Sequence, residues 1–123
     1  MAMDDRNCDP KTRARLAELR RSASRRAADL ANGFDAIVQA ASDVATDDEH
    51  DPEGHTIAWE RQQLAALLAE AREALAGIEA AELRFEAGWY GICTICGLPI
   101  SVDRLHALPA TPTCIACAGR CTP

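Results

Sequence analysis

The chain has 123 residues, a formal net charge of −6 and only 4% aromatic residues. This length allows one modest domain, and so few aromatic side chains cannot fill a broad globular core, which favours helices packed along a narrow seam. The net negative charge argues against a general nucleic-acid binder. No run approaches the ~20 apolar residues needed to cross a bilayer, and no apolar signal region begins the chain, so we expect a cytoplasmic protein without a membrane segment.

Charge is distributed unevenly along the chain. Residues 6–26 hold eight of the 13 basic groups, whereas residues 27–60 hold nine acidic groups and no lysine or arginine. Such a change of sign indicates that the two regions face different environments. The alternative is two helix faces that are simply solvated.

A first helix is predicted to begin at Pro10. Asp9 is placed to cap the free N–H groups of its first turn, and proline at the first helical position loses no hydrogen bond. Gly33 is a weak position in this helix and predicts a bend or a close backbone approach. Apolar residues recur at steps of mostly three and four, at Leu16, Leu19, Ala23, Leu30, Phe34, Ile37, Ala41 and Val44.

A turn and a second helix follow. Residues 46–55 contain five acidic residues, a proline and a glycine, and therefore predict a turn. The second helix is expected to start at Pro52 or Thr56 and to stop at Gly88, which can adopt a left-handed conformation. Its apolar positions are Ile57, Leu64, Leu68, Ala71, Leu75, Ile78 and Phe85.

Two helices of similar length joined by a short turn predict an antiparallel hairpin. The predicted fold is therefore all-α: a long antiparallel coiled-coil hairpin over residues 10–88 with its acidic tip at 46–55, after an N-terminal tail at 1–9. A small four-cysteine zinc-finger globule and a short C-terminal tail occupy residues 89–123. The basic segment is expected beside this globule, and the acidic turn at the opposite end.

Four cysteines carry the strongest chemical signal in the chain. Cys93 and Cys96 form one pair with a two-residue gap, and Cys114 and Cys117 form another after 17 intervening residues. Each gap lets two thiolates point at one ion from a tight turn, which Gly97 favours in the first pair. The pattern predicts one zinc ion, structural because four thiolates leave no open coordination position. Iron in the same cage and a dithiol redox pair are the alternatives, the latter without the βαβ pattern that usually surrounds it.

The remaining candidate ligands and aromatic residues receive plainer interpretations. Cys8 and Cys121 are expected to be spare thiols, although Cys121 lies close enough in sequence to compete as a ligand. His106 is interpreted as a surface or packing residue. Trp59 and Trp89 are interpreted as packing residues, with a role as contact residues as the alternative.

The sequence around the cysteines resembles the DksA/TraR zinc-finger proteins. Their pattern, YGxCxxCGxxIxxxRLxAxPxxxxCxxC, is followed here from Tyr90 to Cys117 at nearly every fixed position, including Ile100, Arg104, Leu105 and Pro109. The preceding hairpin with an acidic turn matches as well, so the resemblance covers about residues 10–118.

This resemblance implies a bacterial transcription regulator that binds RNA polymerase directly and does not contact promoter DNA. In that family the hairpin enters the secondary channel and its tip carboxylates come near the catalytic magnesium. The resemblance thus implies that Asp48, Asp51 and Glu53 form a polymerase active-centre tip and that Arg104 is a candidate polymerase contact. It implies no enzymatic activity of the chain itself.

Two departures from the family pattern bear on function. The tip motif DxxDxA has Glu53 in place of alanine, and a gap-free count back from Cys93 places His50 and Glu53 at the two aspartate positions. Members that bind guanosine tetraphosphate carry basic residues where this chain has Leu108 and Ala118. Because leucine and alanine cannot hold a highly charged nucleotide, we expect no synergy with this alarmone.

Other functions stay open at this point. The hairpin could serve as an interaction adaptor for a partner other than polymerase, and the acidic turn could act only as a set of solvated helix caps. A DNA-binding zinc finger is disfavoured, because residues 93–123 carry only Arg104 and Arg120 against Asp103. An enzyme is disfavoured because no nucleophile–base arrangement or open metal site is recognisable.

Overall fold

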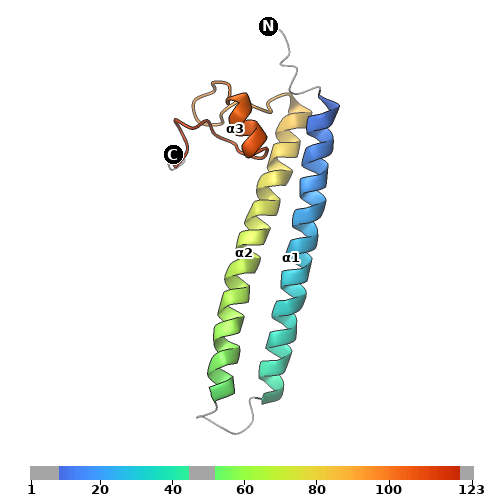
Figure 1. Cartoon of the computed structure of the whole chain (residues 1–123), viewed down its shortest axis with the longest axis vertical. Helices are drawn as coiled ribbons and strands as arrows, with labels where there is room; N and C mark the ends of the chain where they lie inside the picture. Colours follow the sequence, from blue (N-terminus) through green and yellow to red (C-terminus); the bar gives the residue numbers. More distant parts are fainter. Residues whose placement is uncertain (1–8, 45–51, 120–123) are drawn as a thin grey trace. The chain divides into compact units, whose positions relative to one another are not determined.

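The structure is a computed structural model that describes residues 9–44 and 52–119. It contains the helices α1 (Pro10–Val44), α2 (Pro52–Ala87) and α3 (Val102–Ala107), shown in Figure 1. Within the described residues, extended pairing is limited to an isolated bridge between Ile92 and Pro99. The predicted all-α fold, with two long helices packed together and a C-terminal four-cysteine cluster, is confirmed. None of the described helices is both long and apolar enough to span a membrane.

The chain divides into two compact units, and α1 and α2 each contribute a segment to both. The described part of the first unit consists of residues 9–21 and 76–119, and that of the second consists of residues 22–44 and 52–75. The division into tail, hairpin and finger predicted from the sequence stays a prediction.

The start of α1 follows its sequence signal. Asp9 accepts hydrogen bonds through its side chain from the Lys11 backbone N–H at 3.0 Å and from the Thr12 hydroxyl at 3.1 Å. Its carbonyl oxygen accepts from the Arg13 backbone N–H at 3.2 Å, and Pro10 is the first helical residue. The predicted cap is therefore confirmed, because the Lys11 N–H, which has no partner within the helix, donates to the Asp9 side chain.

The end of α2 is fixed by Gly88, as expected. Its φ of 85° lies in the left-handed region. The Trp89 N–H donates to the Arg84 carbonyl at 2.8 Å, and the Gly88 N–H donates to the Phe85 carbonyl at 3.2 Å. These are the two bonds of a Schellman motif, which stops the helix and turns the chain toward the cysteines.

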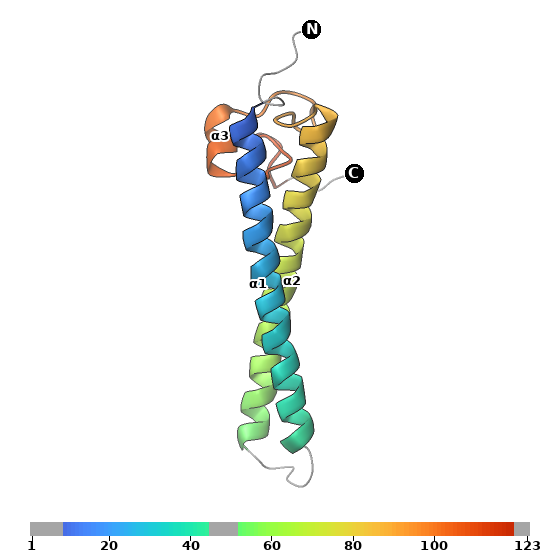
Figure 2. The ribbon, with the colours of Figure 1, turned by 90° about the vertical axis from the view of Figure 1, so that its right-hand side faces the viewer.

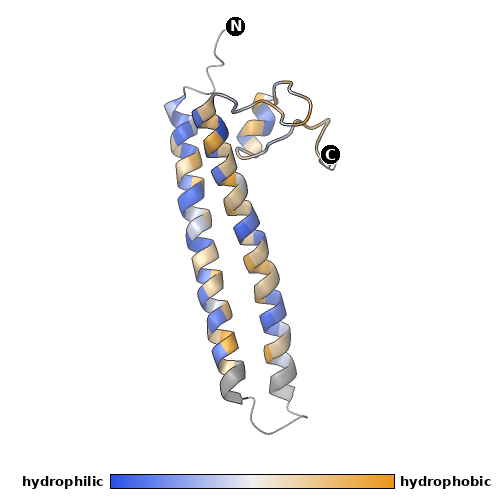
Figure 3. Cartoon of the chain, turned by 180° about the vertical axis from the view of Figure 1, so that it is seen from behind, coloured by the Kyte–Doolittle hydropathy of each residue, from blue (hydrophilic) through white to orange (hydrophobic). Residues whose placement is uncertain are grey.

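In the second unit the helical segments 22–44 and 52–75 lie side by side (Figures 1 and 2). Leu68 and Ala71 are buried there, and the other described residues of the two predicted stripes are partly buried. Polar and apolar residues accordingly alternate along both helices in Figure 3. A Cβ added at Gly33 would lie 3.7 Å from Leu64 Cδ1, and α1 continues unbroken through this glycine. The predicted bend is therefore absent, and the predicted close backbone approach is not seen either, since a methyl at Gly33 would make only an ordinary van der Waals contact with a side chain.

The first unit packs the beginning of α1 against the end of α2. Arg13 pairs with Glu86 at 3.3 Å and Arg20 with Glu82 at 2.8 Å, so the partner on α2 moves back along the chain as the residue on α1 moves forward. This is the antiparallel arrangement predicted from the sequence. The hydrophobic core of the unit comprises Leu16, Ala81, Phe85, Tyr90, Cys93, Ile100, Leu105 and Cys117.

The two helix glycines give a direct test of this packing. In Gly33→Ala the new methyl makes an ordinary van der Waals contact with Leu64, and in Gly77→Ala it meets no atom within 4 Å. Each substitution should raise the free energy of unfolding by up to ~1 kcal/mol, because alanine loses less backbone entropy than glycine on entering a helix. Urea denaturation of the zinc-loaded protein measures the change.

Gly88→Ala is the matched control. It also replaces glycine by alanine, but at a φ of 85°, and should lower the free energy of unfolding by about 1 kcal/mol. A loss of stability in Gly33→Ala as large as that in Gly88→Ala would contradict the packing described for the helices.

Candidate metal centre

The first cysteine pair lies on a tight turn that directly follows the Schellman motif. The Gly97 N–H donates to the Cys93 carbonyl at 2.9 Å, and the Cys93 N–H donates to the Leu98 carbonyl at 2.9 Å. Gly97 has a φ of 75°, as its position after the pair predicts. This turn brings the thiols of Cys93 and Cys96 to the same side of the backbone.

The second pair lies on a similar turn after α3. The Cys117 and Ala118 N–H groups both donate to the Cys114 carbonyl, at 3.1 and 2.9 Å. A backbone hydrogen bond of 2.8 Å from the Thr94 N–H to the Pro112 carbonyl joins the first turn to the segment leading into the second. The two cysteine turns are therefore held together by protein contacts as well as by a shared ion.

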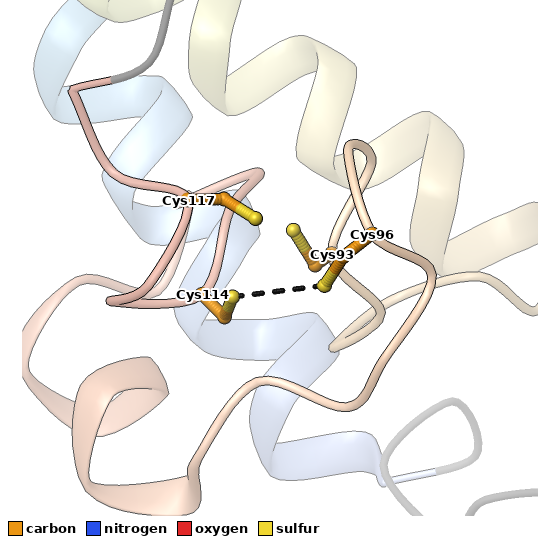
Figure 4. Close-up of side chains that lie close together, drawn as sticks. All are labelled: Cys93, Cys96, Cys114 and Cys117. Carbon is orange, nitrogen blue, oxygen red and sulfur yellow. Dashed lines mark hydrogen bonds between the residues drawn. The ribbon is translucent and has the colours of Figure 1, made fainter.

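The four sulfur atoms converge on one point. All four Sγ atoms lie within 4.8 Å of one another, and those of Cys96 and Cys114 are 3.8 Å apart (Figure 4). Four sulfurs placed tetrahedrally at the usual zinc–sulfur distance of about 2.3 Å are about 3.8 Å apart. All four cysteines are free thiols. The donor set therefore fits one zinc ion, with Cys93, Cys96, Cys114 and Cys117 as its ligands.

The cluster has an inner and an outer side. Cys93 and Cys117 are 2% and 5% exposed and belong to the hydrophobic core, whereas Cys96 is exposed and Cys114 is half-buried. A zinc ion held here would be bound by two core residues on one side and would lie close to solvent on the other. Such an ion stabilises folding of a segment that has few apolar residues of its own.

The surroundings of the two inner thiols shift their pKa values in opposite directions. Backbone hydrogen bonds, chiefly from the Cys96 N–H, outweigh burial and lower the pKa of Cys93 to about 6. Burial, followed by side-chain hydrogen bonds from the neighbouring cysteines, raises the pKa of Cys117 to about 12. Before zinc binds at neutral pH, Cys93 is thus mainly a thiolate and Cys117 a thiol, so binding must displace the Cys117 proton.

Side chains from both long helices hold the end of α3 and the segment that follows it. Arg15 of α1 donates to the His106 carbonyl at 2.7 Å, and Arg84 of α2 donates to the Ala110 carbonyl at 3.2 Å. The buried Tyr90 donates its hydroxyl proton to the Pro109 carbonyl at 2.8 Å. Sequence reasoning missed Arg15 and Arg84, because no sequence signal marks an arginine whose partner is a backbone carbonyl.

Several other predicted site residues are outside the described residues, lack a described side chain or lie at the surface. Asp48 and Asp51 are outside the described residues, as are Cys8 and Cys121, and Glu53 lies in the first turn of α2 without a described side chain. His106 and Ala118 are exposed, and Leu108 is 51% exposed.

The packing interpretation of the two tryptophans was wrong. Trp59 and Trp89 are 61% and 63% exposed. Trp59 lies on an exposed face of α2, and Trp89 is exposed just after the end of this helix.

Comparison with known proteins agrees with the geometry of the metal centre. Residues 88–120 match the family model described as the prokaryotic dksA/traR C4-type zinc finger. The segment is a DksA/TraR zinc finger. The predicted zinc cofactor is thereby confirmed, and the predicted family resemblance is confirmed at this finger.

Two individual proteins extend the comparison. The uncharacterized protein YteA of Bacillus subtilis (strain 168) is 39% identical over 66 residues, which are 54% of this chain and 28% of YteA. The chain thus matches well under half of that relative. The structure of transcription factor DksA2 from Pseudomonas aeruginosa aligns with a TM-score of 0.57 and 23% identity, covering 92% of this chain and 84% of that one. This second likeness shows that the fold is shared.

Zinc affinity should fall as the pH falls. Because the pKa of Cys117 is raised to about 12, this thiol stays protonated in the metal-free protein between about pH 6.5 and 8 and releases its proton when zinc binds. The apparent zinc affinity should therefore drop at least about tenfold for each pH unit lowered. Competition with a chromophoric chelator of known pH dependence measures this.

A Cys8→Ser variant is the control for thiols outside the cluster and should show the same dependence. An affinity that stays constant over this pH range would contradict coordination by the Cys117 thiolate.

Proposed function

We propose that this protein is a bacterial transcription regulator that binds RNA polymerase directly through the secondary channel of the enzyme. The observation that carries the proposal is the DksA/TraR zinc finger at residues 88–120, which follows directly from the end of α2. A fold shared with a transcription factor over most of the chain supports it. The protein would act in the cytoplasm, where polymerase is found.

In this proposal the two regions of the chain have separate tasks. The finger is a structural element, because four thiolates leave the zinc ion no open position for catalysis. The acidic turn acts near the polymerase active centre through Asp48, Asp51 and Glu53. Carboxylates are suitable ligands for magnesium, so they would influence the polymerase's own ion, and the chain itself would be no enzyme.

Charge pairing in the first unit favours a protein partner over DNA. Arg13 and Arg20 of the basic segment are paired with Glu86 and Glu82, which reduces the positive charge available to phosphates. Leu108, with 51% of its surface exposed, offers no charge to guanosine tetraphosphate. We therefore propose polymerase binding without sequence-specific DNA contact and without a response to this alarmone. A polymerase contact at Arg104 stays a prediction.

An interaction adaptor is the second candidate. The observation that favours it is a hollow of about 630 Å³ beside the first cysteine turn, lined in part by Leu83, Trp89 and Ile95. Leu83 and Trp89 are 72% and 63% exposed, an apolar surface of the kind that protein partners cover. An adaptor would retain the zinc finger but select a partner other than polymerase.

Charge removal at the acidic turn tests the proposed function. The double variant Asp48→Asn/Asp51→Asn should still bind purified RNA polymerase but lose its effect on transcription in vitro, because amides cannot replace carboxylates near magnesium. Binding is measured by co-purification, and the effect by the lifetime of initiation complexes. His50→Ala/Glu53→Gln tests the alternative register of the tip in the same assay.

Asp29→Asn/Asp35→Asn removes the same charge from exposed positions on α1 and should leave both measurements unchanged. Absence of polymerase binding by the unmodified protein, or tip variants that all act like the unmodified protein, would overturn the proposal.

A further inference from the structure

The short segment that leads into the second cysteine turn is fixed by one arginine side chain. Arg104 lies in α3, whose N-terminus is capped by Ser101 through a hydrogen bond from the Arg104 N–H to Ser101 Oγ at 3.2 Å. The Arg104 guanidinium donates through Nε to the Thr113 carbonyl at 2.8 Å and through Nη2 to Thr111 Oγ1 at 3.3 Å. Thr113 directly precedes the zinc ligand Cys114.

The two threonines complete a closed set of contacts. Thr111 Oγ1 donates to the Thr113 carbonyl at 3.2 Å and accepts from the Thr113 N–H at 3.5 Å. Between them, the Pro112 carbonyl accepts from the Thr94 N–H, which belongs to the first cysteine turn. The backbone at 111–113 is therefore held from α3 on one side and from the first cysteine turn on the other.

We propose that Arg104 is a positioning residue for the zinc ion, acting through the backbone at 111–113 to set the direction from which Cys114 approaches the metal. The half-buried guanidinium fits this role because its rigid fork reaches two acceptors at once. A lysine ammonium, a single point charge on a flexible stem, cannot hold both. Groups that orient metal ligands from outside the coordination shell typically alter metal affinity 10- to 100-fold when removed.

The test is the rate of zinc release from the full-length protein to an excess of chromophoric chelator. Arg104→Gln should release zinc about 10- to 100-fold faster, because Cys114 is no longer held in place. Arg104→Lys should recover only part of this loss. Thr111→Val removes one of the two acceptors and should also accelerate zinc release, but by a smaller factor. In the double variant Arg104→Gln/Thr111→Val, the fold-increase in the release rate should not exceed the product of the fold-increases in the two single variants.

Arg15→Gln is the matched control. It removes the same side-chain charge and also breaks a hydrogen bond to a backbone carbonyl, but this acceptor is His106 in the last turn of α3 and not the segment at 111–113 that precedes Cys114. The rate of zinc release from this variant should stay within about twofold of that of the unmodified protein, because Arg15 does not hold the backbone next to a zinc ligand.

The cobalt-substituted protein separates positioning from a general loss of folding. At saturating cobalt, the visible ligand-field bands should shift or weaken in Arg104→Gln and stay unchanged in Arg15→Gln, because only the former disturbs the tetrahedron of sulfurs. Equal release rates for Arg104→Gln and the unmodified protein would overturn the proposal, as would equal acceleration in Arg15→Gln. If Arg104→Gln does not fold, the release rate of Thr111→Val takes its place, and a rate equal to that of the unmodified protein would overturn the proposal.

Discussion

The requirement that four thiolates reach one ion governs the structure of residues 88–119. Each sulfur must lie about 2.3 Å from zinc, so the backbone turns that carry the cysteines have little freedom. The Schellman end of α2 delivers the chain into the first turn, and the contact between Thr94 and Pro112 aligns the second turn with it. Because Cys93 and Cys117 are also core residues, coordination and hydrophobic burial depend on each other here.

Several arginines of the first unit stabilise its fold through hydrogen bonds to backbone carbonyls or through ion pairs. Arg84 and Arg104 each donate to a backbone carbonyl of the segment between α3 and the second cysteine turn, and Arg15 donates to the His106 carbonyl in the last turn of α3. Arg13 and Arg20 pair with acidic residues of α2. Arg13, Arg15 and Arg20 of the basic segment thus have partners within the first unit, which reduces the positive charge available to a phosphate-binding surface and leaves the acidic turn as the region proposed to act on a partner.

Features set by local chemistry could be predicted from the sequence. The Asp9 cap, the Gly88 stop, the positive φ of Gly97 and the helix stripes each depend on residues close together in the chain, and all are present. The zinc site could be predicted because two-residue cysteine spacing directly reflects coordination geometry. The carbonyl contacts of Arg15 and Arg84 could not, since they join residues 91 and 26 positions apart. The exposure of Trp59 and Trp89 was missed because single aromatic residues carry no periodic signal.

X-ray absorption spectroscopy at the zinc edge tests the central claim most directly. The full-length protein, purified without added metal, should contain one zinc ion whose first shell holds four sulfur atoms at about 2.3 Å. This result would place all four thiolates on a closed structural site, as the convergence of Cys93, Cys96, Cys114 and Cys117 requires. A nitrogen or oxygen ligand at about 2.0–2.1 Å, which would point to a histidine or water in place of one cysteine, would contradict it.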